Sequence, residues 1–403
     1  MERYAGIDLA SEEHRLCLVD GEGRQLEQRR IGHDEQGLSA LCQRLVELGV
    51  SRVALERPDG LVVDRLLEAG LTVVAVHPNQ LAATRDRYSV AGGKSDGFDS
   101  YVLAELCRTD MHRLRVFEPD TDETKALRVL TRTREDLVQA RVSLANQLRA
   151  QLDAFWPGAG RVFSEVDTPI ALAFLERYPS PAEARGMGEK RLAGFLARHG
   201  YSGRRSPAEL LERLRQAPQG RTGELETEAR RQVVLGLVAA LKPIVEQIKL
   251  ATSQIAGALD AHPDGQIFRS LFRDPKSVVT AAELLAEIGD CRSRYPTRDT
   301  LAADAGMSPV AVESGKRKVA CFRYACDKRL RDAVACLADA SRKHNPWAHD
   351  IYQRARARGH DHPHAIRILG RAWLRVIWRI WQNHEPYDPT LHRNLQRLNT
   401  TKG

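Results

Sequence analysis

Residues 1–118 of this chain follow an order of apolar segments that strongly limits how they can fold. Three strand-like segments come first, and short turns rich in Gly, Asp and Glu separate them. Helical stripes then alternate with two more strand-like segments, an order typical of parallel strands joined by helices. The sequence therefore predicts a mixed sheet covered by helices. The expected strands are residues 3–9, 15–19, 25–31, 52–56 and 72–77, and the expected helices are 38–48, 60–69, 78–85 and the segment that begins at 96.

Four acidic residues lie at the ends of these elements. Asp8 closes the first strand-like segment and Glu56 closes the fourth, while Asp96 and Asp99 are spaced to share one face of a helix. Each acid alone is more often a turn residue or a helix cap. Together, carboxylates at strand ends and on a facing helix are suitable ligands for Mg²⁺ or Mn²⁺. Two such ions can hold both oxygens of a phosphodiester displacement, so the pattern predicts metal-dependent cutting or joining of nucleic acid.

Basic residues are concentrated in the C-terminal quarter of the chain. Residues 301–403 contain 19 Lys and Arg but only 9 Asp and Glu, although the net charge of the whole chain is only +8. The remaining 300 residues are therefore slightly acidic. Such an asymmetry predicts that a polyanion docks on the C-terminal region. A basic face that is merely solvated is the alternative.

Two long helical stripes separate the N-terminal region from the basic one. Residues 120–155 and 224–260 carry Leu and Ile at spacings typical of coiled-coil helices, although Pro243 should kink or break the second. Self-association into a dimer or tetramer and ordinary packing within one chain are both compatible with these stripes. With 403 residues, two or three domains are expected. We predict an α/β domain at 1–118, coiled-coil helices at 119–262 with an insertion of short helices at 157–223, and a mostly helical basic domain at 263–403.

A serine in a basic loop forms a second candidate site. Ser314 is followed by Gly315 and then by three cations. Glycine lets the backbone approach a phosphate closely, cations stabilise phosphoryl charge, and the hydroxyl could attack phosphorus. Most serines in such loops are only turn residues. An Arg ridge at 371, 375 and 379 on the last helix could track phosphates. The predicted nucleic-acid contacts are Lys94, Lys316, Arg317, Lys318, Arg323, Arg371 and Arg375.

Targeting signals and disulfide patterns are missing from the sequence. No run of about 18 apolar residues occurs, so we expect no membrane-spanning helix. The first residues lead directly into a strand without the pattern of a signal peptide. Seven scattered cysteines without a Cys-x-x-Cys pair favour reduced thiols. A cytoplasmic protein is therefore expected.

Two sets of motifs resemble those of one protein family. Tyr4-Ala5-Gly6-Ile7-Asp8 and Lys94-Ser95-Asp96-Gly97-Phe98-Asp99 resemble the N-terminal motifs of the insertion-sequence one-ten transposases. These are DEDD-type recombinases related to Piv-like DNA invertases. Residues 284–290, 301–309 and 313–315 are similar to the second domain of that family. The resemblance covers nearly the whole chain, in the order RuvC-like domain, long helices and serine-bearing domain.

The resemblance implies a fold, a cofactor, partners and roles for residues. It implies a ribonuclease-H-like (RuvC-like) N-terminal fold in which Asp8, Glu56, Asp96 and Asp99 bind magnesium. It also implies that Ser314 attacks DNA and that a structured guide, the bridge RNA, pairs with donor and target DNA. The whole would be a DNA transposase or recombinase.

Three other functions remain open from the sequence. A nuclease like the Holliday-junction resolvases would leave the basic serine domain unexplained. An ATP-dependent enzyme of the actin–sugar-kinase class should carry a second Gly-rich phosphate loop, which we do not find. A nucleic-acid-binding module with inactive acids would keep its function without Asp8.

Overall fold

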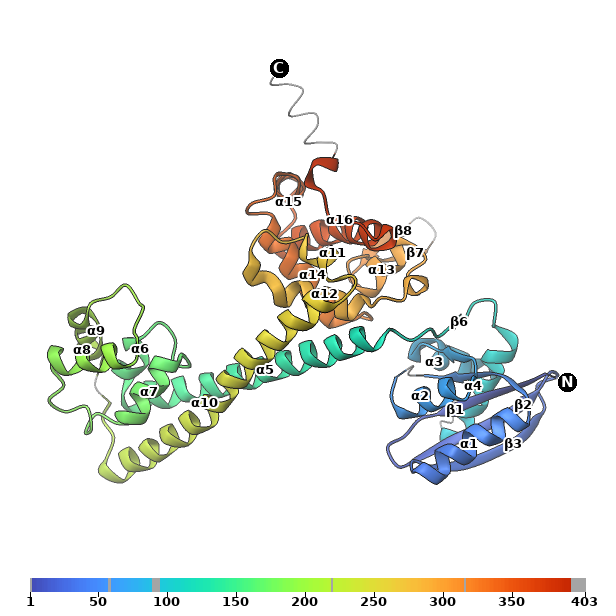
Figure 1. The fold of residues 1–403 in the computed structure, drawn as a ribbon, viewed down its shortest axis with the longest axis horizontal. Helices are drawn as coiled ribbons and strands as arrows, with labels where there is room; N and C mark the ends of the chain where they lie inside the picture. The colour runs from blue at the N-terminus through green and yellow to red at the C-terminus, as the bar shows by residue number, and fades with distance from the viewer. Residues whose placement is uncertain (1, 57–58, 89–94, 219, 315–316, 393–403) are drawn as a thin grey trace, which may run out of the picture. The chain divides into compact units, whose positions relative to one another are not determined.

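The computed structural model describes residues 2–56, 59–88, 95–218, 220–314 and 317–392. The chain forms two compact units, Met1–Pro119 and Asp120–Gly403. Figure 1 shows the elements of each unit. The long helices and the basic C-terminal region, which the sequence analysis separates at residues 262–263, belong to the same unit.

A six-stranded mixed sheet forms the centre of the first unit. Its strand order is β3-β2-β1-β4-β5-β6. The first three strands are antiparallel, β4 and β5 run parallel to β1, and the two-residue β6 runs antiparallel to β5. The predicted mixed sheet is thus confirmed, with β6 as an unpredicted edge strand. The strands are β1 Arg3–Asp8, β2 Glu13–Asp20, β3 Gln25–Gly32, β4 Val50–Leu55, β5 Val73–Ala75 and β6 Arg115–Val116.

Helices cover both faces of this sheet. Side chains alternate between the two faces along a strand, so Ala5 and Ile7 of β1 pack with α1 (Glu35–Glu47) and α2 (Leu61–Glu68). Tyr4 of β1 and Ala54 of β4 point the other way, into a core with α3 (Pro78–Tyr88) and α4 (Asp96–Thr109). Strand parity therefore decides which residues can face α4.

Gly6 allows α4 to lie directly on β1. A Cβ atom at this position would overlap the carbonyl oxygen of Ser100 and the amide nitrogen of Ala104. Any larger residue would have to push the helix away from the strand, because backbone atoms cannot rotate aside as a side chain can. The glycine of the Tyr4–Asp8 motif thus sets the distance between the sheet and α4.

The second unit is built on two long helices, α5 (Asp122–Phe155) and α10 (Glu224–Ala261), which pack against each other (Figure 1). Pro243 lies inside a continuous α10, so the break considered at this position is absent. Leu241 and Ile248 are buried on either side of the proline. Packing on both sides of the proline compensates for the backbone hydrogen bond that the proline removes from the helix.

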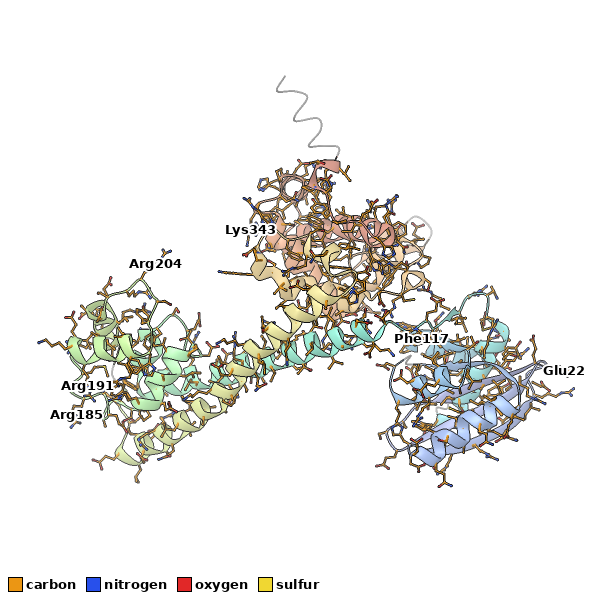
Figure 2. The ribbon with its side chains drawn as sticks, viewed as in Figure 1. Glu22, Phe117, Arg185, Arg191, Arg204 and Lys343 are labelled. Atoms are coloured by element: carbon orange, nitrogen blue, oxygen red, sulfur yellow. The ribbon has the colours of Figure 1, made fainter. Side chains whose placement is uncertain are left out.

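A cluster of short helices lies at residues 157–218, within the segment 157–223 that the sequence analysis treats as an insertion. Its core also contains Leu148 and Leu152 of α5 and Val234 and Val238 of α10. At its surface Arg191, labelled in Figure 2, lies 5.2 Å from the ring centroid of Tyr178. The helices are α6 Pro157–Val162, α7 Pro169–Arg177, α8 Glu189–Arg198 and α9 Pro207–Gln216.

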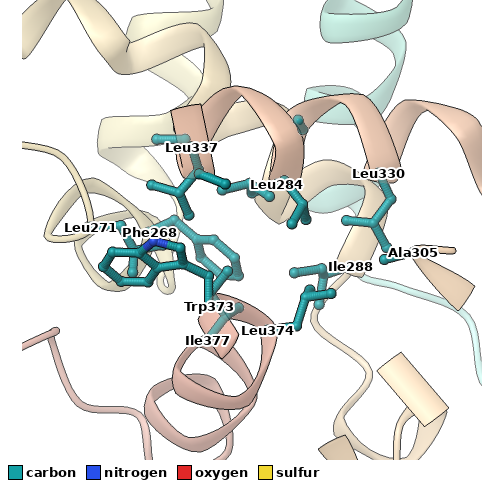
Figure 3. Packing of buried hydrophobic residues seen from close by; sticks show 14 of the residues in the cluster. Phe268, Leu271, Leu284, Ile288, Ala305, Leu330, Leu337, Trp373, Leu374 and Ile377 are labelled. Carbon is teal, nitrogen blue, oxygen red and sulfur yellow. The ribbon is translucent and has the colours of Figure 1, made fainter. Parts of the chain in front are cut away.

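The basic C-terminal region packs around a core centred on α12, α14 and α16, shown in Figure 3. Leu127 of α5 and Ile255 and Leu259 of α10 join this core, which explains why the long helices and this region form one unit. A two-stranded hairpin projects from the region. The elements are α11 Gly265–Arg269, η1 Pro275–Ser277, α12 Val278–Ile288, η2 Arg292–Arg294, α13 Arg298–Asp304, β7 Val310–Ser314, β8 Arg317–Cys321, α14 Lys328–Ser341, α15 Pro346–Ala357, α16 His362–Asn383 and η3 Pro389–Leu391.

Acidic side chains crowd where α12 meets α5 and α14. Burial raises the pKa of Glu283 to about 7. The charges of Glu135, Glu287 and Asp332 raise the pKa of Glu283 further, while Arg134 acts in the opposite direction. Glu287 has a guanidinium partner of its own, Arg132, whose two nitrogens lie 2.9 and 2.6 Å from its carboxylate oxygens. Within the described residues Glu283 forms no such ion pair, so its charge is compensated only by the more distant Arg134.

Replacing Glu283 by Gln should stabilise the protein at high pH. At a pH near 4.5, the ordinary pKa of this group, the Glu283 carboxyl is still largely protonated in the folded state, so its ionisation costs little folding stability. As the pH rises towards 7 the unfolded chain loses this proton first, so folding stability falls. We expect Glu283→Gln to raise stability at pH 8 by about 1–3 kcal/mol, and much less at pH 5. Thermal unfolding of both proteins at the two pH values measures this difference, and an equal effect at both would contradict it.

Candidate functional site

Asp8 and Glu56 lie beside each other at one edge of the sheet. In the parallel pairing of β1 and β4, Ile7 is opposite Leu55, and the two acids follow directly. By alternation, Asp8 shares a face with Gly6, and α4 covers this face of β1. Ala54 of β4 lies on the same face, and Glu56 is the first residue after β4 ends at Leu55. The strand register therefore brings the two half-buried acids side by side at the ends of β1 and β4.

Asp96 and Asp99 lie in the first turn of α4. The helix begins after Ser95, whose side chain accepts a hydrogen bond from the amide of Phe98. Asp96 is exposed, whereas Asp99 is only 3% exposed and sits next to Ser100, the residue in contact with Gly6. The close packing at Gly6 thus holds the first turns of α4 near β1, and the Asp99 side chain is buried there.

Arg85 of α3 holds the carboxylate of Asp99. Its Nε and one terminal nitrogen donate to the two oxygens at 2.5 and 2.8 Å. Such a bidentate guanidinium gives the buried carboxylate the hydrogen bonds and the positive charge that it needs, as a bound metal ion would do with its charge. Sequence analysis missed this residue, because its position in the 78–85 segment gives no sign of where its guanidinium reaches.

The predicted acid quartet is only partly assembled in this arrangement. Among the described residues, no three Asp, Glu, His or Cys side chains are close enough to hold one metal ion. The chemistry of the donors fits a divalent cation, but Asp99 would have to exchange Arg85 for it. Joint metal binding by the four acids remains a prediction.

Two cysteines, Cys17 and Cys107, are buried in the core between the sheet and α4 and have unreactive thiols. Burial raises the pKa of Cys17 and of Cys107 to about 12. A thiol with such a pKa stays protonated near neutral pH and is a poor nucleophile or metal ligand. All seven cysteines of the chain are free thiols, as the sequence predicts.

Ser314 lies at the outer end of the hairpin in the second unit. It is the last residue of β7, it is exposed, and it is paired with Arg317 of β8. Glu313 is opposite Lys318 in the same register. The hairpin register therefore places the backbone of Arg317 opposite Ser314 and the backbone of Lys318 one position away. Lys316 and Lys94 lie outside the described residues.

The other predicted cations gather at the foot of the hairpin. Arg323, Arg371 and Arg375 all line a single cavity of about 590 Å³. Arg367, which lies one turn before Arg371, lines it as well and was missed by the sequence analysis. Arg379, the third member of the predicted ridge, is exposed but does not line the cavity.

Two protein-family models match the chain. The model described as "Transposase" matches residues 5–157, and the model described as "Transposase IS116/IS110/IS902 family" matches residues 277–353. The first covers the four acids of the N-terminal unit. The second covers the hairpin that carries Ser314.

Relatives are similar over nearly the full length. The "Mini-circle putative transposase for IS117" of Streptomyces coelicolor is 32% identical over 96% of this chain and 95% of its own. The "Insertion element IS110 uncharacterized 43.6 kDa protein" of the same organism is 26% identical over 98% and 97%. A solved structure, "T. thermophilus RuvC in complex with Holliday junction substrate", matches with 18% identity and a TM-score of 0.23, covering 28% of this chain and 99% of that one.

In the described parts of the chain, no helix combines the length and apolar character needed to cross a membrane.

The family models match in the order that the sequence motifs predict, and the IS117 relative extends the similarity over almost all residues. The chain therefore belongs to the IS116/IS110/IS902 family of transposases, enzymes of DNA recombination.

Proposed function

We propose that this transposase cuts and rejoins the DNA strands of an insertion sequence with two sets of residues. Asp8, Glu56, Asp96 and Asp99 form the metal-binding set, and Ser314 is the nucleophile. The observation that carries the proposal is the placement of three of these acids: Asp8 and Glu56 follow one another at the ends of neighbouring parallel strands, and Asp99 is buried in the first turn of α4, the helix that packs on β1.

The acids divide into a sheet pair and a helix pair. Asp8 and Glu56 would approach a metal from the strand ends, and Asp96 and Asp99 from the first turn of α4. A bound Mg²⁺ or Mn²⁺ would neutralise phosphate charge and stabilise the leaving oxygen. Arg85 holds the Asp99 carboxylate through two hydrogen bonds. A bound cation would take the place of this guanidinium, so the buried carboxylate would keep a positively charged partner.

Ser314 would form the covalent link to DNA. As its Oγ bonds to phosphorus, the bond from phosphorus to the departing strand breaks; the serine loses its proton and the departing oxygen gains one. The phosphoserine ester conserves bond energy, so a DNA hydroxyl can later attack it without any nucleotide cofactor. The exposed position at the end of β7 leaves room for a DNA backbone to approach.

Three kinds of partner follow from this mechanism and from the family resemblance. They are donor DNA, target DNA and a structured bridge RNA that pairs with both. We also propose a homo-oligomer, dimer or tetramer, formed through the long helices. Exposed apolar side chains along α5 and α10, among them Val129, Val142 and Leu250, support contacts with another copy. The serine and the acid set could then come from one copy or from two.

Arg85→Met should couple the stability of the chain to metal binding. Removing the guanidinium leaves the Asp99 carboxylate buried without its partner and should cost about 1–3 kcal/mol when no metal is present. Mn²⁺ should recover most of this loss, so the variant should gain more thermal stability from Mn²⁺ than the unchanged chain. Equal gains in the two proteins would show that Asp99 does not bind the metal.

Asp8→Asn should remove both metal binding and recombination. The amide lacks the charge that holds a divalent cation, so we expect weaker Mn²⁺ binding by calorimetry and at least about a 100-fold loss of strand transfer. Glu22→Gln is the control, since Glu22 lies in the β2–β3 turn and is exposed beside Arg24 (Figure 2). Full activity of the Asp8 variant in Mg²⁺ would reject the metal set.

Ser314 should carry a DNA adduct when the reaction is trapped. The reaction needs DNA with the ends of the element and the RNA transcribed from them, and digestion followed by mass spectrometry locates the adduct. Ser314→Ala should abolish it. Ser308 is the control, because its hydroxyl is buried and has no hydrogen-bond partner within the described residues. Recombination by Ser314→Ala without any adduct would instead indicate a nuclease that uses water.

A further inference from the structure

The cavity at the foot of the hairpin is strongly cationic. It opens between the β7–β8 hairpin and helices α15 and α16, and four arginines line it together with His364. None of the lining residues is acidic. Within the described parts of the chain, Arg323, Arg367 and Arg375 form no ion pair, and Arg371 reaches only the exposed Asp299 at 3.4 Å. So much uncompensated charge around one cavity calls for an anionic ligand.

The charges in this cavity also act on one another. Burial lowers the pKa of His364, and the neighbouring charges of His360 and Arg367 lower it further. Arg371 has a buried Nε without a hydrogen-bond partner in the described residues. A bound phosphate would supply both the missing acceptor and the missing negative charge.

The spacing of the arginines favours a strand over a single phosphate. Arg367, Arg371 and Arg375 are four residues apart on α16, so they share one face at intervals of about 6 Å. This interval is close to the separation of successive phosphates along an extended strand. Arg323 faces them from the hairpin side, where its Nε donates to the Ser308 carbonyl oxygen at 3.0 Å.

Two aromatic rings lie beside these cations. The ring of Phe322 lines the cavity between the guanidinium groups of Arg331 and Arg367, at 4.8 and 5.2 Å. Tyr324 meets the Phe322 ring edge-on at 4.8 Å between centroids, and Tyr324 is 79% exposed. An exposed ring next to a cationic groove is the combination that binds unpaired bases by stacking.

The hairpin connects this cavity with the serine. Val310 and Cys321 are paired at its foot, next to the cavity, and Ser314 and Arg317 are paired at its far end. Four steps along a strand span roughly 14 Å. A nucleic-acid strand that follows the hairpin would therefore place nucleotides in the cavity a few positions from the phosphate at Ser314.

We propose that this cavity binds an unpaired segment of the DNA strand that Ser314 attacks. Arg323, Arg367, Arg371 and Arg375 hold its phosphates, and one base stacks on Tyr324. The assignment to the attacked strand rests on the proposed function of Ser314. The stacking surface favours unpaired DNA over a duplex, whose bases are already stacked on each other.

Binding of labelled DNA to the full chain tests the proposal. Fluorescence anisotropy compares a single-stranded oligonucleotide with the duplex of the same sequence, in the Ser314→Ala background so that no adduct forms. Tyr324→Leu should weaken single-strand binding by about 10-fold and duplex binding by less than about 2-fold. Arg375→Gln should weaken single-strand binding and lower its salt dependence by about one counterion.

Arg379→Gln is the matched control, because Arg379 lies one turn after Arg375 on the same helix but outside the cavity. It should leave single-strand binding unchanged. Unchanged binding by Tyr324→Leu, or an equal loss for the duplex, would overturn the proposal. So would tighter, Tyr324-dependent binding of RNA of the same sequence, which would assign the cavity to the guide. If Ser314 proves not to form an adduct, the proposed mechanism fails while these binding differences still stand.

Discussion

The contact between α4 and β1 at Gly6 is the constraint on which the N-terminal site depends. Here a helix lies on a strand so closely that a single added carbon would strike the backbone at Ser100 and Ala104. Two consequences follow. Asp99 is buried in the first turn of α4, and it needs a cationic partner, which Arg85 provides. The same contact packs α4 on the face of β1 that carries Asp8, because Gly6 places no side chain between the strand and the helix.

In the second unit, buried ion pairs hold helices in place, as the Gly6 contact does in the first unit. Asp120 precedes α5, and its carboxylate accepts hydrogen bonds from Arg128 at 2.5 Å and Arg294 at 2.7 Å. Burial alone would raise the pKa of Asp120, but the two guanidinium groups hold it below its ordinary value. Such a carboxylate stabilises the fold while it is ionised, and this contribution is lost as the pH falls through its lowered pKa. The pairs join the start of α5 to η2, the short helix that follows α12, and so support the region that carries the hairpin.

The two sets of proposed reactive residues belong to different compact units. The acids sit on a sheet and its covering helix, and the serine sits on an exposed hairpin whose foot is a cationic cavity. In the proposed mechanism, each set would bind its own ligand, a divalent cation for the acids and a DNA strand for the serine. The arginines of α16 are also more than a solubilising face, since three of them line the cavity beside the hairpin.

The sequence by itself determined the element order, the mixed sheet, the long helices and the positions of the four acids, because alternating and helical apolar patterns are local signals. It also indicated the basic loop of Ser314 and three arginines of the later cavity, Arg323, Arg371 and Arg375. Tertiary structure alone decided that Arg85 pairs with Asp99, that Arg367 lines the same cavity as Arg323 and Phe322, and that α10 passes through Pro243 unbroken. These features depend on which faces pack together, and contacts between residues far apart in the chain leave no periodic trace in the sequence.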